Sequence, residues 1–132
     1  MIKNIDITEL EVSNDPIETL DHLAQPFLDL AKKLEEVRLN GTDAETWTAL
    51  GDANVFYWRL IVNYLPKHFA SSVSPASKAM LEMIADFMLR ASKAMRQSPD
   101  TALLAQMVQL NLNMSDQILS IAEKIENERM AA

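Results

Sequence analysis

Two histidines are the first side chains to examine for chemistry in this sequence. Glu18 and His22 lie four residues apart, a spacing at which a carboxylate and an imidazole on one helix can share a metal ion or form a surface pair. A di-metal site in a helical bundle needs two Glu-x-x-His pairs, and the sequence contains none. His68 has no acidic residue near it in sequence, so we interpret it as a solvated loop histidine.

Nucleophilic catalysis and phosphate binding have no support in the sequence either. There is no cysteine, and the 2 glycines, Gly41 and Gly51, exclude a glycine-rich phosphate loop. Glu82, Asp86 and Arg90 follow one another at four-residue steps, which predicts an exposed stripe with an ion pair rather than an acid-base pair. We therefore predict a protein that is not an enzyme and that needs no metal or cofactor.

Two asparagines at helical stripe positions are candidates for specific contacts. Asn54 lies between Leu50 and Tyr57, and Asn111 follows Met107 in a similar apolar stripe. A buried amide without hydrogen bonds costs about 1–3 kcal/mol, so each asparagine needs a partner. Two roles fit these positions. The amides can bond to each other or to a Trp or Tyr and fix the register of the helices, or they can bind the backbone of another protein.

Methionine and aromatic residues concentrate in particular segments. Six of the 8 methionines lie between residues 80 and 114, where they can fill a core or line an adaptable groove for a partner's helix. All the Trp and Tyr residues lie between residues 47 and 64, and their N–H and O–H groups need partners when buried. We select as candidate partner-binding residues Asn54, Trp58, Met83, Phe87, Arg90, Asn111 and Met114.

Start and stop signals divide the chain into four amphipathic helices. The predicted starts are Asp15-Pro16, Thr42 with Glu45, Ser74-Pro75 and Ser98-Pro99-Asp100, and the predicted stops include Asn40-Gly41 and Pro66. These signals predict helices at about residues 16–40, 43–65, 75–96 and 99–127.

We predict an all-α fold, a single four-helix bundle over residues 15–128 with antiparallel neighbours. Pro26 predicts a kink or break near residues 22–26 of the first helix. Residues 1–14 are predicted to be an extended arm or a frayed tail, residues 66–74 to be the one long link, and residues 129–132 to be a tail.

Charge and hydropathy narrow the class of partner. The net charge of -7 arises entirely in residues 1–45, which disfavours nucleic acid as a partner there. The basic residues between Lys67 and Arg96 lack the interleaved aromatics of a nucleic-acid platform, and we interpret them as solvated surface. No apolar run is long enough to span a membrane, and the first residues lack the pattern of a signal peptide. We expect a cytoplasmic protein that binds neither nucleic acid nor membrane.

Several short patterns together resemble the FlaF family of flagellar biosynthesis regulators. They are Asn54 with Trp58, Lys78-Ala79, Ile84-Ala85 with Phe87 and Arg90, and the run from Met107 to Asn111. The resemblance covers roughly residues 15–122, whereas Ser74-Pro75 and a longer preceding link depart from the family pattern.

The resemblance implies a cytoplasmic helical regulator or chaperone that binds flagellin and supports its synthesis or export, in the same pathway as the regulator FlbT. It implies hydrophobic contacts from Trp58, Met83, Phe87 and Met114, amide bonding from Asn54 and Asn111, and charge pairing from Arg90. The alternative is a self-associating helical module, a homodimer for example, without affinity for flagellin.

Overall fold

The structure is a computed structural model that describes residues 15–97 and 100–131. Within these residues the chain forms four α-helices, one short 3-10 helix and no strand. The elements are α2 (Pro16–Asn40), α3 (Ala44–His68), η1 (Ala70–Ser72), α4 (Pro75–Gln97) and α5 (Thr101–Ala131). The predicted extended arm at residues 1–14 lies outside the described residues.

The first helix, α2, has the caps that its sequence predicts. The Asp15 carboxylate accepts a hydrogen bond from the backbone N–H of Ile17 at 3.0 Å, and Pro16 occupies the first turn. At the other end, the N–H of Gly41 donates to the carbonyl of Val37 at 2.7 Å. Pro26 lies inside α2, and the helix continues through it. The predicted break of the helix near residues 22–26 therefore does not occur.

Both ends of α3 differ from the prediction. Asp43, rather than Thr42, is the N-cap, and its carboxylate accepts from the N–H of Thr46 at 2.7 Å. This bond to the ionised carboxylate lowers the pKa of Asp43. Pro66 does not end the helix, which continues to His68, because a proline in the last turn removes only one backbone donor.

The last two helices also begin with side-chain caps. The Ser74 hydroxyl accepts from the N–H of Ser77 at 3.1 Å before α4. Asp100 accepts from the N–H groups of Ala102 and Leu103 at 2.9 and 3.2 Å, so α5 starts at Thr101 rather than at Pro99. α5 then continues to Ala131, past the predicted end near residue 127.

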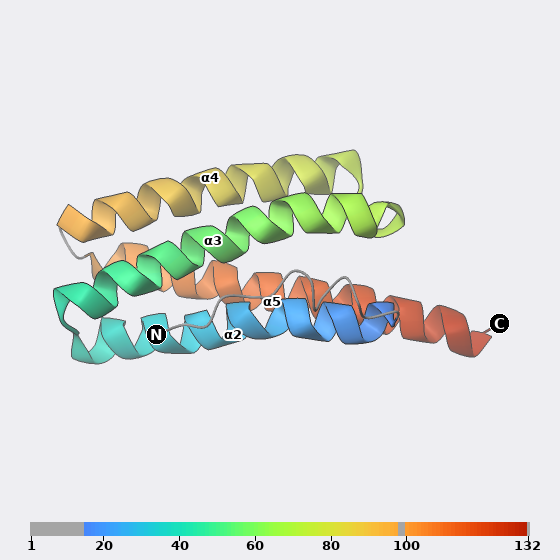
Figure 1. Cartoon of the computed structure of the whole chain (residues 1–132), viewed down its shortest axis with the longest axis horizontal. Coiled ribbons are helices and arrows are strands. Elements are labelled where there is room, and N and C mark those ends of the chain that lie inside the picture. The colour runs from blue at the N-terminus through green and yellow to red at the C-terminus, as the bar shows by residue number, and fades with distance from the viewer. Residues whose placement is uncertain (1–14, 98–99, 132) are drawn as a thin grey trace.

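The helices alternate in direction and form two closely packed pairs, α2 with α5 and α3 with α4 (Figure 1). α3 also packs against α2, whereas α4 touches α5 little. Two ion pairs join distant parts of the chain, Arg129 with Asp15 at 3.4 Å and Arg96 with Asp52. The predicted four-helix bundle with antiparallel neighbours is therefore confirmed.

The core extends along the whole bundle, and each helix contributes to it. Among its most deeply buried large side chains are Leu20, Phe27 and Leu30 of α2, Trp58, Ile61 and Leu65 of α3, Met88 of α4, and Met107 and Ile118 of α5. The link between α3 and α4 contains η1, which packs against α3. Phe69 at the start of this link lies beside Tyr64, with ring centroids 6.4 Å apart.

Candidate interaction surfaces and the buried amide network

A chain of buried hydrogen bonds crosses the centre of the bundle. The indole N–H of Trp58 donates to Oδ1 of Asn111 at 2.7 Å, and Nδ2 of Asn111 donates to Oδ1 of Asn54 at 2.9 Å. Nδ2 of Asn54 lies 3.2 Å from the sulfur of Met88, a weak acceptor. We call these four residues, Trp58, Asn111, Asn54 and Met88, the amide network.

The amide network joins three helices, and an aromatic contact adds the fourth. Phe27 of α2 packs edge-on against Trp58, with ring centroids 5.4 Å apart and an interplanar angle of 77°. Both asparagines are 0% exposed, and each amide has a partner within the fold. Of the two roles that fit these asparagines, the structure shows the internal one. Any relative shift of α3 and α5 would separate the two amides, so the network fixes their register.

The candidate partner-binding residues separate into a buried and a surface group. Asn54, Trp58, Asn111 and Met114 are buried in the core. They offer no surface to a partner that docks on the closed bundle, and direct contact with them requires the helices to separate. Their predicted role as contact residues therefore holds only for an opened bundle, whereas their packing role is visible in this structure.

The surface group lies on one face of α4. Met83 is 71% exposed and Met80 is 62% exposed, while Phe87 is half-buried. Arg90 is exposed and forms an ion pair with Asp86 at 3.2 Å. Residues 80, 83, 87 and 90 fall within about 80° of one another around a helix. We call Met80, Met83, Phe87 and Arg90 the methionine stripe.

The methionines as a set divide between two roles. Met88, Met95, Met107 and Met114 are buried and fill the core. Only Met80 and Met83, among the six between residues 80 and 114, have the exposure that binding a partner requires. The core-filling interpretation thus describes four of the six, and the partner-binding interpretation is restricted to the first half of α4.

Both tryptophans of α3 donate their indole N–H groups to polar partners, as the sequence predicts. The indole N–H of Trp47 donates to the backbone carbonyl of Met95 at 2.7 Å, which ties the start of α3 to the end of α4. Burial, with a smaller contribution from the negative charge of Asp29, raises the pKa of Tyr57 above its usual value. The hydrogen bonds of Trp47 and Trp58 thus tie α3 to α4 and to α5.

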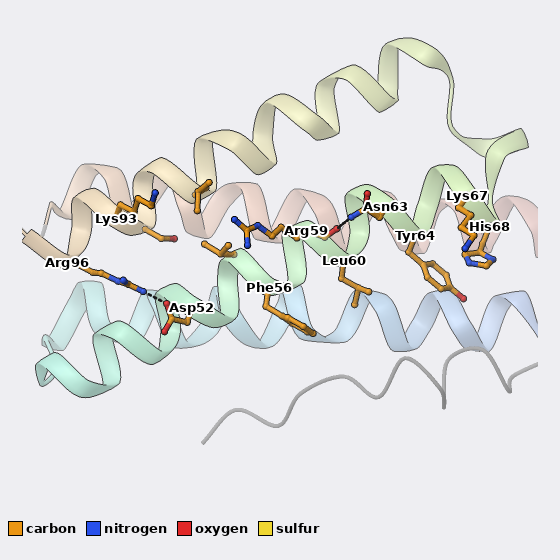
Figure 2. A pocket seen from close by; sticks show the side chains of 13 residues that line it. Asp52, Phe56, Arg59, Leu60, Asn63, Tyr64, Lys67, His68, Lys93 and Arg96 are labelled. Atoms are coloured by element: carbon orange, nitrogen blue, oxygen red, sulfur yellow. Dashed lines mark hydrogen bonds and ion pairs between the residues drawn. The ribbon is translucent and has the colours of Figure 1, made fainter.

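A surface that the sequence analysis did not identify lies between α3 and α4, where a groove of about 650 Å³ opens to solvent (Figure 2). We call it the α3–α4 groove. Its lining residues include an apolar set, which we call the floor (Val55, Phe56, Leu60, Tyr64 and Leu89), and a basic set, which we call the rim (Arg59, Lys67, Lys93 and Arg96).

The sequence contains the residue pattern that forms this groove, but the pattern has the same spacing as the core-facing residues of the same helix. The α3 residues that line the groove repeat at three- and four-residue steps from Asp52 to Lys67. The core-facing residues of α3 repeat in the same way, so the helix is apolar on two faces and a single-stripe interpretation misses the outer one. The mild basic patch that we interpreted as solvated surface contributes Lys67, Lys93 and Arg96 to this rim.

The two histidines lie on different helices, His22 on α2 and His68 on α3. His22 is exposed on α2. His68 closes the last turn of α3 rather than lying in a loop, and its ring stacks on Tyr64 with centroids 4.3 Å apart. No group of three or more potential metal ligands occurs among residues 15–97 and 100–131. In the part of the chain that the structure describes, no helix has the length and apolarity needed to cross a membrane.

The fold and the two surfaces define a helical bundle with candidate docking faces on its outer helices. Comparisons of the chain with protein-family models, with curated proteins and with solved structures find no match.

Proposed function

We propose that the protein is a non-enzymatic cytoplasmic regulator or chaperone whose methionine stripe binds an amphipathic helix of flagellin. The observation that carries the proposed site is the exposure of Met80 and Met83 on one face of α4. Large apolar side chains that are adjacent and exposed favour a protein-binding role. Unbranched thioether side chains also adapt to different apolar partners.

The setting of the stripe supports docking of a helix. α4 packs on α3 and touches α5 little, and Met88 is the first buried residue along α4. The first half of α4 thus presents an incompletely covered amphipathic face, against which a partner's helix can bury its own apolar stripe. Arg90, at the end of the stripe, adds a positive charge that is only partly neutralised by its exposed pairing with Asp86.

Flagellin as the partner rests on the resemblance to the FlaF family. Of the residues that carry the resemblance, Asn54, Trp58 and Asn111 belong to the amide network, and Phe87 and Arg90 belong to the methionine stripe. In this proposal the network holds the bundle in register, and the stripe contacts the partner. A regulator of the FlbT type would act in the same pathway.

Substitution of one exposed methionine tests the proposal. Met83→Glu places a charge on the docking face and is expected to weaken flagellin binding about tenfold or more in titration calorimetry. Met130→Glu is the matched control, because Met130 is 78% exposed at the end of α5 and outside the stripe. Equal affinity of both variants, or no binding of flagellin by the unmodified protein, contradicts the proposal.

Self-association is the second candidate, since the same exposed methionines can meet those of another copy. The mass in solution separates the two functions. A monomer that forms a 1:1 complex when flagellin is added supports the flagellin proposal. A stable dimer that dissociates in Met83→Glu and has no affinity for flagellin supports the self-associating module.

A further inference from the structure

The α3–α4 groove combines an apolar floor with a basic rim, in which Arg96 alone has an ion-pair partner among the described residues. Phe56 is 37% exposed, and Leu60, Tyr64 and Leu89 beside it are half-buried. The groove follows α3 from Asp52 to His68, which corresponds to about 24 Å of helix. Its volume of about 650 Å³ has room for the side chains along one face of a helix of that length.

The charge of the rim is opposite to that of the whole chain. The chain carries -7, yet the residues lining the groove include four Lys or Arg and a single Asp. Asp52 is paired with Arg96. Among the described residues, Arg59, Lys67 and Lys93 form no ion pair. A ligand with negative charges can pair with these three side chains.

A buried hydroxyl lies beside the groove. Ser92 is 4% exposed, and its hydroxyl has no hydrogen-bond partner in the described part of the chain. Because this oxygen is buried, a helix docked on the groove reaches it only if α3 and α4 move apart, and the assignment of the groove rests on its apolar and basic residues.

We propose that the α3–α4 groove is a docking site for an acidic amphipathic helix of a partner protein. The apolar stripe of such a helix would pack on Phe56, Leu60 and Leu89, and Asp or Glu residues on its flanks would pair with Arg59 and Lys93. Complementary charges along both flanks would set the orientation of the helix and speed its association.

This site is distinct from the methionine stripe, so the inference goes beyond the proposed function. By the 100° step of a helix, Leu89 and Arg96 of the groove lie about 120° or more around α4 from Met83 and Phe87, whereas Lys93 lies about 80° from Met83. Most of the other lining residues belong to α3, so a partner on the stripe leaves most of the groove accessible. Each docking site can therefore fail experimentally while the other holds.

A charge-reversal experiment on the full-length protein tests the inference. The probes are two synthetic amphipathic helices of about 18 residues with the same leucine stripe, one flanked by glutamates and the other by lysines. We expect the unmodified protein to prefer the glutamate peptide in fluorescence anisotropy. In the double variant Arg59→Glu/Lys93→Glu, we expect affinity for the glutamate peptide to fall about tenfold or more and preference to pass to the lysine peptide.

Two further variants identify the place of binding. Lys33→Glu/Lys124→Glu makes the same change in net charge at exposed positions on α2 and α5, outside both the groove and the methionine stripe, and is expected to retain the original preference. Phe56→Ser is expected to lower the affinity for both peptides. A thermal melting curve of this variant shows whether the bundle remains folded.

Three outcomes overturn the inference. One is a preference that does not reverse, or that reverses equally in the Lys33→Glu/Lys124→Glu control. Another is that a peptide of residues 1–14 displaces the glutamate peptide and binds with equal affinity, which would assign the groove to this chain's own N-terminal segment. The last is that the unmodified protein is a homodimer and that Arg59→Glu/Lys93→Glu makes it a monomer, which would assign the groove to a second copy of the chain. Loss of flagellin binding in Met83→Glu with peptide binding intact distinguishes the two docking sites.

Discussion

At the scale of single residues, the amide network explains why two polar side chains occupy the apolar stripes of α3 and α5. Asn111 is central to it, because its amide accepts from Trp58 and donates to Asn54. Hydrogen bonds between buried neutral groups contribute modestly, about 0.5–1.5 kcal/mol each, whereas an orphaned buried partner costs about 1–3 kcal/mol. The network therefore contributes more to the choice of register than to net stability.

Removal of the Asn111 amide is expected to be costly for that reason. Asn111→Ala leaves the indole N–H of Trp58 and Oδ1 of Asn54 buried without partners, and we expect the free energy of unfolding to fall by about 2–4 kcal/mol in urea titrations. Asn113→Ala is the control, since Asn113 is exposed on the same helix and is expected to change stability by less than about 0.5 kcal/mol.

A double-mutant cycle tests whether the two asparagines act together. The combined effect of Asn54→Ala and Asn111→Ala is expected to be smaller than the sum of the single effects, with a coupling of about 0.5–3 kcal/mol. Strict additivity, or equal stability of Asn111→Ala and Asn113→Ala, would show that the network does not form.

At the scale of the elements, the two glycines show how local backbone geometry sets helix boundaries. Gly41 ends α2 with φ 74° and ψ 176°, a conformation that is nearly restricted to glycine. Gly51 lies inside α3, where a Cβ would be 3.6 Å from Cβ of Ser92, an ordinary van der Waals distance. One glycine is required by its conformation, and the other weakens a helix.

Alanine is therefore expected to have opposite effects at these two positions. Gly41→Ala should destabilise the protein by about 1–3 kcal/mol although space is open around it, because the backbone conformation is strained. Gly51→Ala should stabilise it by about 0.5–1 kcal/mol through the helix propensity of α3. Each variant is the control for the other in thermal unfolding, and effects of the same sign would contradict this account.

Features fixed by neighbouring residues could be predicted from the sequence. The start of α2 at Asp15-Pro16 and its end at Asn40-Gly41 depend on caps a few residues long, and the structure has them there. The prediction that α3 ends at Pro66 is wrong. A proline ends a helix only where no hydrogen bonds or packing hold the turn that follows it. α3 continues past it to His68, where Phe69 then caps the helix against Leu65.

Contacts between distant segments could be predicted in kind but not in detail. The sequence indicates that Asn54 and Asn111 need partners, yet 57 positions separate them, and their direct bond depends on how α3 and α5 pack. The burial of Met114 and the exposure of Met83 depend in the same way on how α5 and α4 pack against the other helices. The α3–α4 groove depends on which of the two apolar faces of α3 remains uncovered.

At the scale of the whole molecule, the packing is unequal across the bundle. α2 and α5 pack closely, and α5 contributes buried residues from Leu104 to Ala122. α4 rests mainly on α3, and its first half contains no buried residue before Met88. Segments with little buried apolar contact open locally at lower free energy than the core does. The first half of α4 is thus the part of the bundle most suited to rearrange around a partner.

Hydrogen exchange is expected to reveal this inequality. Backbone amides of residues 79–87 should exchange at least about tenfold faster than those of residues 107–118, since a difference of about 1.4 kcal/mol in opening free energy corresponds to a tenfold ratio. Mass spectrometry of peptides from each segment measures the ratio, with α2 as the internal reference for global unfolding. Addition of flagellin should slow exchange in residues 79–87 if a helix docks on the methionine stripe. Equal exchange of the two segments would mean that α4 is held as firmly as α5, and docking would then have to occur on a rigid surface.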